Sequence, residues 1–163
     1  MSDKTALVVK MTVDNWNSHL KRTDDLFNEL TDEQLAGQVS PHRNRGVYLL
    51  GHLAAVNDRL IPLLGFGDQL HPELNDTYLA NPDDASKQGV SAQDLRAHWK
   101  EINEKLQKHI NSLSTDEWLQ KHTTVSEEDF AKEPHRNRLN VLISRTGHMA
   151  GHLGQLLFLK NKA

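Results

Sequence analysis

The chain has 163 residues, a net charge near −3, a hydrophobic fraction of 37% and no cysteine. This length and composition predict one globular domain over residues 1–163, and the missing cysteines exclude disulfides and thiolate metal clusters. A nearly neutral chain offers no electrostatic basis for binding nucleic acid. No apolar run reaches the roughly 18 residues that cross a membrane, and the N-terminus does not resemble a signal peptide, so we expect a cytoplasmic protein.

Four long segments repeat apolar residues at steps of three and four, the spacing that is typical of helices. The second segment should end near Pro62, because proline and the glycines that follow it interrupt a helix. The third should begin after Ser91, a good N-cap, and a short helix should follow it at 115–120. No segment has a convincing strand pattern. The four predicted long helices span about residues 5–30, 46–64, 91–113 and 138–159.

Two predicted connections are long, at roughly residues 65–90 and 112–137. Long connections are often functional. They also allow crossovers, so that sequential helices need not be antiparallel neighbours. The predicted fold is therefore an all-α four-helix bundle with long crossover connections.

The sequence Pro-His-Arg-Asn-Arg occurs twice, at residues 41–45 and 134–138, each time just before a predicted helix. This repeat suggests two related helical hairpins. In one interpretation it is a repeated helix start with solvated arginines, in which Asn44 and Asn137 are the N-caps. In the other, both segments lie at one end of the bundle, and their arginines bind a carboxylate of the substrate. The candidate substrate-binding residues are Arg43, Arg45, Arg136 and Arg138.

Three histidines form the candidate metal site. His148 and His152 lie one turn apart on one face of the last helix, so both rings can reach one ion. In a chain with ten histidines, such a pair can also arise by chance on an exposed surface. His52 lies on the flank of the second helix's apolar stripe, where a histidine needs a metal or, alternatively, a hydrogen-bonding partner in the core.

Helix geometry brings these histidines to similar depths. In an up-down bundle the second and fourth helices run in the same direction, so their N-termini lie at the same end. His52 is about 12 Å along its helix from Asn44, and His148 is about 16 Å from Asn137. Three protein ligands leave a coordination position open, a pattern that is typical of catalytic metals.

Two segments carry a resemblance to the DinB-like (DinB/YfiT-like) family: Gly51-His52-Leu53-Ala54, and His148-Met149-Ala150-Gly151-His152-Leu153-Gly154-Gln155. The His-x3-His-x-Gly-Gln pattern is the most specific mark of this family, and the resemblance extends over essentially the whole chain. It implies a four-helix bundle of unusual connectivity, often dimeric, whose metal would be held here by His52, His148 and His152. Characterised members include thiol S-transferases and isomerases that use low-molecular-weight thiols. The Pro-His-Arg-Asn-Arg repeat is not part of the family pattern.

A bound divalent ion lowers the pKa of a coordinated thiol or water. We therefore expect a thiol S-transferase or a hydrolase that acts on a small molecule, with zinc or nickel as the metal. One alternative is a non-catalytic protein of the stress response that binds a metal or a small molecule. Another is a structural dimer with incidental histidines. The expected partners are a small substrate, such as a low-molecular-weight thiol, and a second copy of the chain.

Overall fold

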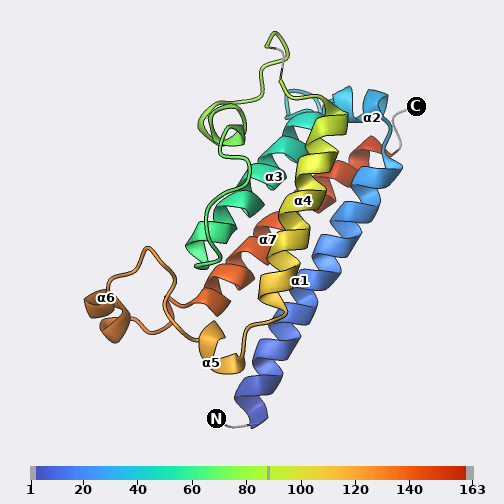
Figure 1. The fold of residues 1–163 in the computed structure, drawn as a ribbon. Coiled ribbons are helices and arrows are strands. Elements are labelled where there is room, and N and C mark those ends of the chain that lie inside the picture. Colours follow the sequence, from blue (N-terminus) through green and yellow to red (C-terminus); the bar gives the residue numbers. More distant parts are fainter. Residues whose placement is uncertain (1–2, 88, 161–163) are drawn as a thin grey trace.

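Four long helices form a bundle in the computed structural model of the chain, which describes residues 3–87 and 89–160 (Figure 1). They are α1 (Asp3–Glu29), α3 (Gly46–Leu63), α4 (Ala92–Ile110) and α7 (Arg138–Leu156). The short elements are α2 (Asp32–Ala36), the π-helical turn η1 (Asp76–Ala80), α5 (Thr115–Trp118), α6 (Glu127–Lys132) and the 3-10 turn η2 (Leu157–Leu159). No strand occurs in the described residues, so the predicted all-α bundle is confirmed.

The helix starts follow from their caps, with one exception. Ser91 and Asn137 cap α4 and α7 as expected, each accepting a hydrogen bond from a backbone N–H three residues later. The expectation that Asn44 caps α3 is wrong, because Arg45 holds that position and makes no side-chain cap bond. The backbone N–H of Arg45 instead donates to the Asp83 carboxylate at 2.7 Å. A residue from the α3–α4 connection therefore fixes the start of α3.

The directions of the long helices differ from an up-down bundle. α1 and α7 lie side by side and run in the same direction, as do α3 and α4, whereas the two pairs are antiparallel (Figure 1). Gly46, at the start of α3, accordingly lies against Leu159, just after α7. The expectation that α3 and α7 run in the same direction is therefore wrong. The connection between α3 and α4 returns along the bundle, which allows α4 to run parallel to α3.

The chain consists of two similar hairpins, α1–α3 and α4–α7. In each hairpin a short helix with a reciprocal capping box follows the first long helix, with Thr31 capping α2 and Ser114 capping α5. The Pro-His-Arg-Asn-Arg sequence then precedes the second long helix. Because α3 and α7 are antiparallel, the two copies of this sequence lie at opposite ends of the bundle.

Large apolar side chains fill the space between the four long helices, and Trp16, Trp99 and Trp118 are almost completely buried. Burial of each large apolar side chain contributes about 1.5–3 kcal/mol, so this core holds the helices in one arrangement. Within the part of the chain that the structure describes, no helix is long and apolar enough to cross a membrane.

Further contacts hold the α3–α4 connection on α3. The buried carboxylate of Asp58 accepts hydrogen bonds from the backbone N–H groups of Leu70 at 2.8 Å and His71 at 2.9 Å. Further along, η1 packs on Gly51, where an added Cβ would overlap the ring of Tyr78. Only a glycine leaves room for this close approach, which brings the backbone of Tyr78 next to α3.

Candidate metal centre

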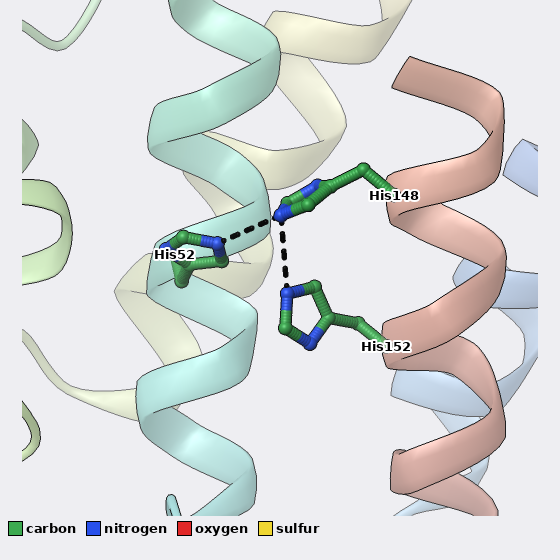
Figure 2. Close-up of side chains that lie close together, drawn as sticks. All are labelled: His52, His148 and His152. Atoms are coloured by element: carbon green, nitrogen blue, oxygen red, sulfur yellow. Dashed lines mark hydrogen bonds between the residues drawn. The ribbon is translucent and has the colours of Figure 1, made fainter. Parts of the chain in front are cut away.

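Three histidines meet in the space between α3 and α7 (Figure 2). His52 projects from α3, and His148 and His152 project from α7. The Nε2 atom of His148 lies 3.2 Å from the Nε2 atom of His52 and 3.2 Å from that of His152. All three rings are partly buried and present the same nitrogen to a common point.

These distances fit a metal ion. Zinc binds histidine nitrogen at about 2.0–2.1 Å, so two nitrogens at tetrahedral positions are about 3.4 Å apart. The two observed separations of 3.2 Å are close to this value. Without an ion, the nitrogen of His148 faces two others, and one proton can bridge only one of these contacts. A cation between the rings would satisfy all three lone pairs.

Hydrogen bonds at the far side of two rings leave Nε2 free for a metal. The Nδ1–H of His52 donates to the carbonyl oxygen of Tyr78 at 2.9 Å, and a carbonyl can only accept. The Nδ1–H of His152 donates to the side-chain oxygen of Gln155 at 2.8 Å. With the proton on Nδ1, the lone pair lies on Nε2, as metal ligation requires. The Nδ1 atom of His148 is buried and has no partner within the described residues.

The electrostatic environment keeps His52 and His148 uncharged at neutral pH. Burial lowers the pKa of His52, although its hydrogen bond to Tyr78 works in the opposite direction. Burial, followed by the nearby rings of His152 and His52, lowers the pKa of His148 to about 4. Unprotonated imidazole is the form that binds a metal, so these two rings do not have to release protons near pH 7.

The antiparallel arrangement explains why the three rings have the same depth. The start of α3 lies beside the end of α7. From that end, His52 is about 9 Å along α3, whereas His152 and His148 are about 6 Å and 12 Å along α7. The depth of His52 therefore falls between those of its two partners. The rings meet as expected, although the helix directions on which that expectation rested are wrong.

The four arginines of the repeated segments are not brought together. Arg43 and Arg45 lie at the start of α3, and Arg136 and Arg138 lie at the start of α7, at the opposite end of the bundle. The expectation that both segments share one end is wrong, because α3 and α7 are antiparallel. Arg45 pairs with Asp83 at 2.5 Å, and Arg136 with Glu133 at 3.2 Å. A role of these arginines in substrate binding stays a prediction.

The sequence reasoning missed several residues around the histidines. The ring of Tyr48 stacks on His52 with centroids 6.2 Å apart, and the four-residue spacing of the two on one helix could have indicated this. Gln155 belongs to the recognised motif, yet its role in orienting His152 follows only from the structure. No sequence signal marks the backbone of Tyr78, in a connection read as a loop, as the partner of His52.

Comparisons with known proteins agree with this architecture. The chain is similar over most of its length to a conserved protein from Enterococcus faecalis of known crystal structure. The two share 16% sequence identity and superpose with a TM-score of 0.61, covering 93% of this chain and 94% of the other. This likeness supports the fold alone, and no curated protein matches the chain. The family model described as the DinB superfamily matches residues 15–156. That match covers most of the chain and includes both helices that carry the three histidines, so the chain belongs to the DinB superfamily.

Proposed function

We propose that the protein binds one divalent metal ion through His52, His148 and His152 and uses it in chemistry on a small molecule. The observation that carries this proposal is the convergence of three Nε2 atoms, with two of the separations at 3.2 Å. Imidazole ligands suit zinc and nickel better than magnesium or calcium. Three protein ligands would leave at least one coordination position for the small molecule, as in catalytic sites.

A bound divalent ion would lower the pKa of a thiol or water that reaches this open position. A thiol bound there would give S-transfer, and a bound hydroxide would give hydrolysis. In S-transfer, the thiol loses its proton and its sulfur forms a bond to an electrophilic carbon. The leaving group departs with the bonding electron pair and takes up a proton.

Metal content is the first test. Protein purified without a histidine tag is expected to contain about one zinc or nickel ion per chain. The double variant His148→Ala, His152→Ala should contain none. Equal metal content in the two proteins would refute the proposed site. Both side chains are only partly buried, so the variant should keep its fold. Circular dichroism checks this.

Thiol transfer separates an enzyme from a binding protein. The metal-loaded protein is incubated with an alkylating electrophile and glutathione, bacillithiol or a mycothiol analogue, and loss of free thiol is measured. Metal-dependent turnover that is absent in the double variant would support an S-transferase. Retained metal without turnover of thiols or of ester substrates would favour the alternative, a non-catalytic binding protein in the stress response.

We also propose that two copies of the chain pair through α1 and α7. Leu7, Val8 and Met11 of α1, Ile143 of α7 and Phe158 of η2 are each more than half exposed. A Cβ added at Gly147 or Gly154 would meet no heavy atom within 4 Å, so another helix can approach α7 closely there. Sedimentation equilibrium should give a dimer for the wild type and a monomer for the double variant Met11→Glu, Ile143→Glu.

A cytoplasmic location of the protein also stays a prediction.

A further inference from the structure

A groove of about 510 Å³ adjoins the three histidines between α3 and α7. On α3 it begins at Val56, one turn after His52, and on α7 it includes Arg145, three residues before His148. Because these helices are antiparallel, both steps lead away from the histidines in the same direction. Leu79 of η1 and Thr123 and Thr124 of the α5–α6 connection complete its walls.

Two arginines line this groove without an acidic partner. Arg59 comes from α3 and Arg145 from α7, and both line the groove. Within the described residues, neither guanidinium makes a hydrogen bond or an ion pair, and Arg145 is partly buried. Burial, followed by the like charge of Arg59, lowers the pKa of Arg145. A partly buried cation beside a second cation is unfavourable unless an anion joins them.

Two other half-buried arginines, which are comparable with Arg145, have acidic partners. The side chains of Arg45 and Arg96 are 25% and 24% exposed, and they pair with Asp83 and Asp32. Arg96 also donates to two backbone carbonyl oxygens at the end of α1. The fold therefore pairs comparable half-buried guanidinium groups elsewhere but leaves that of Arg145 open, beside the exposed Arg59 and the candidate metal centre.

We propose that Arg59 and Arg145 bind an anionic oxygen group, a carboxylate or a phosphate, of the small molecule whose reactive end lies at His52, His148 and His152. The inference rests on the proposed function and specifies its substrate class. Along the helices, Arg145 is about 4.5 Å from His148 and Arg59 about 10 Å from His52. The substrate therefore carries its anionic group roughly 5–10 Å from its reactive atom. Val56, which lies between His52 and Arg59 along α3, and Leu79 supply an apolar wall for the carbon chain between the two.

Binding of matched thiols tests this inference. Calorimetry of the zinc-loaded full chain compares 3-mercaptopropionate and 4-mercaptobutyrate with the uncharged 3-mercaptopropanol and 4-mercaptobutanol. The better acid should bind at least about tenfold more tightly than its alcohol, since paired guanidinium groups bind carboxylates strongly. The double variant Arg59→Gln, Arg145→Gln should lose this preference while its zinc content and alcohol affinity stay unchanged. Arg22→Gln, which removes one exposed positive charge on α1, controls for a long-range effect of charge and should behave as wild type.

Two results would overturn the inference: equal affinity of acids and alcohols for the wild type, or an undiminished preference in the double variant. The Arg145→Lys variant, which keeps the charge, should retain part of the preference.

A zinc-free arm separates this inference from the proposed function. In zinc-free protein, inorganic phosphate or acetate should shift the side-chain Nε–H resonances of Arg59 and Arg145, and the more effective anion identifies the group that the site prefers. Absence of zinc binding together with these shifts would refute the metal-dependent function but keep the anion site. Zinc binding without any shift and without a preference for acids would refute the anion site but keep the metal-dependent function.

Discussion

The three histidines between α3 and α7 can be compared with a second cluster, in which His71 of the α3–α4 connection lies against His98 of α4. The rings of His71 and His98 are stacked with centroids 3.9 Å apart and planes inclined by 13°. The two nitrogens of His71 contact the carboxylates of Glu101 at 2.9 Å and Glu73 at 3.1 Å. In the metal centre, by contrast, the outer nitrogens of His52 and His152 donate to neutral oxygens.

The difference in partners moves the pKa values in opposite directions. Burial works against protonation of His71, but hydrogen bonds with Glu101 and Glu73 outweigh it and raise its pKa. Burial and neighbouring rings lower the pKa of His148 to about 4. The ligand atoms of His71, Glu73 and His98 also lie within 4.8 Å of one another. Yet carboxylates occupy both nitrogens of His71, and the lone pairs of two stacked rings do not converge on one point. Proximity alone is thus a weak indication of a metal site.

The largest expected difference between the clusters is their response to zinc. Zinc at about 1,000 times its dissociation constant should stabilise the wild type by about 4 kcal/mol and raise its melting temperature by about 10 °C. His98→Ala should keep this increase, whereas His52→Ala should lose it. Differential scanning calorimetry with and without zinc measures both. An equal increase in the two variants would mean that the ion binds elsewhere.

A smaller effect is expected from Gly51→Ala. The new Cβ would overlap the ring of Tyr78, so η1 must shift, and with it the carbonyl that orients His52. Overpacking of this kind costs about 1–3 kcal/mol, and loss of the orienting bond should weaken zinc binding about tenfold or more. The matched control is Gly151→Ala, where the new Cβ meets no heavy atom within 4 Å. In urea unfolding that control should be as stable as the wild type or slightly more stable, and in zinc titration its affinity should be unchanged.

Acidification of the zinc-free protein tests the lowered pKa of His148. Its pKa is about 4 in the folded chain, against an ordinary value of 6.5. Between these values the unfolded chain binds a proton at this position and the folded chain does not, so stability should fall as the pH falls from about 6.5 to about 4. Because the ring is partly exposed, we expect a loss of about 1–2 kcal/mol. In urea unfolding across this range, His148→Gln should lose correspondingly less. Identical pH dependence of the two proteins would contradict the interpretation.

The smallest expected effect belongs to the second cluster and has the opposite sign. A raised pKa means that the stabilising contribution of His71 is fully present below its unfolded pKa and is lost as the pH rises through its folded pKa. Glu101→Gln should therefore lower the free energy of unfolding by about 0.5 kcal/mol near pH 5.5, a small cost because the Glu101 carboxylate is exposed. Near pH 9, where His71 is uncharged, the cost should be almost zero. Urea unfolding at both pH values provides the measurement. An equal cost at both would show that the pair is not ionic.

The sequence predicted the elements better than their arrangement. Apolar spacing located the four long helices, because each must bury one face. The histidines His148 and His152 were visible as a pair, because their partnership is local to one helix. Helix direction was not, since the same Pro-His-Arg-Asn-Arg sequence precedes both α3 and α7 and carries no information about which ends meet. The pairing of His71 has no sequence signal either, because its partner Glu101 is 30 residues away.

The open charge in the groove was equally invisible to sequence reasoning. Arg59 and Arg145 are ordinary arginines on two helices, and they are distinguished by lining one groove without an acidic partner. A missing contact depends on every surrounding element and leaves no local pattern. Arg45 illustrates the converse, because its partner Asp83 lies in a connection whose path the sequence did not reveal.

The division of the ligands between the two hairpins has a consequence for cooperativity. His52 belongs to the hairpin α1–α3, whereas His148 and His152 belong to the hairpin α4–α7. An ion held by all three would act as a cross-link between the N-terminal and C-terminal halves of the chain. Separation of the halves would then require release of the ion, so metal availability would govern the rate at which the chain opens.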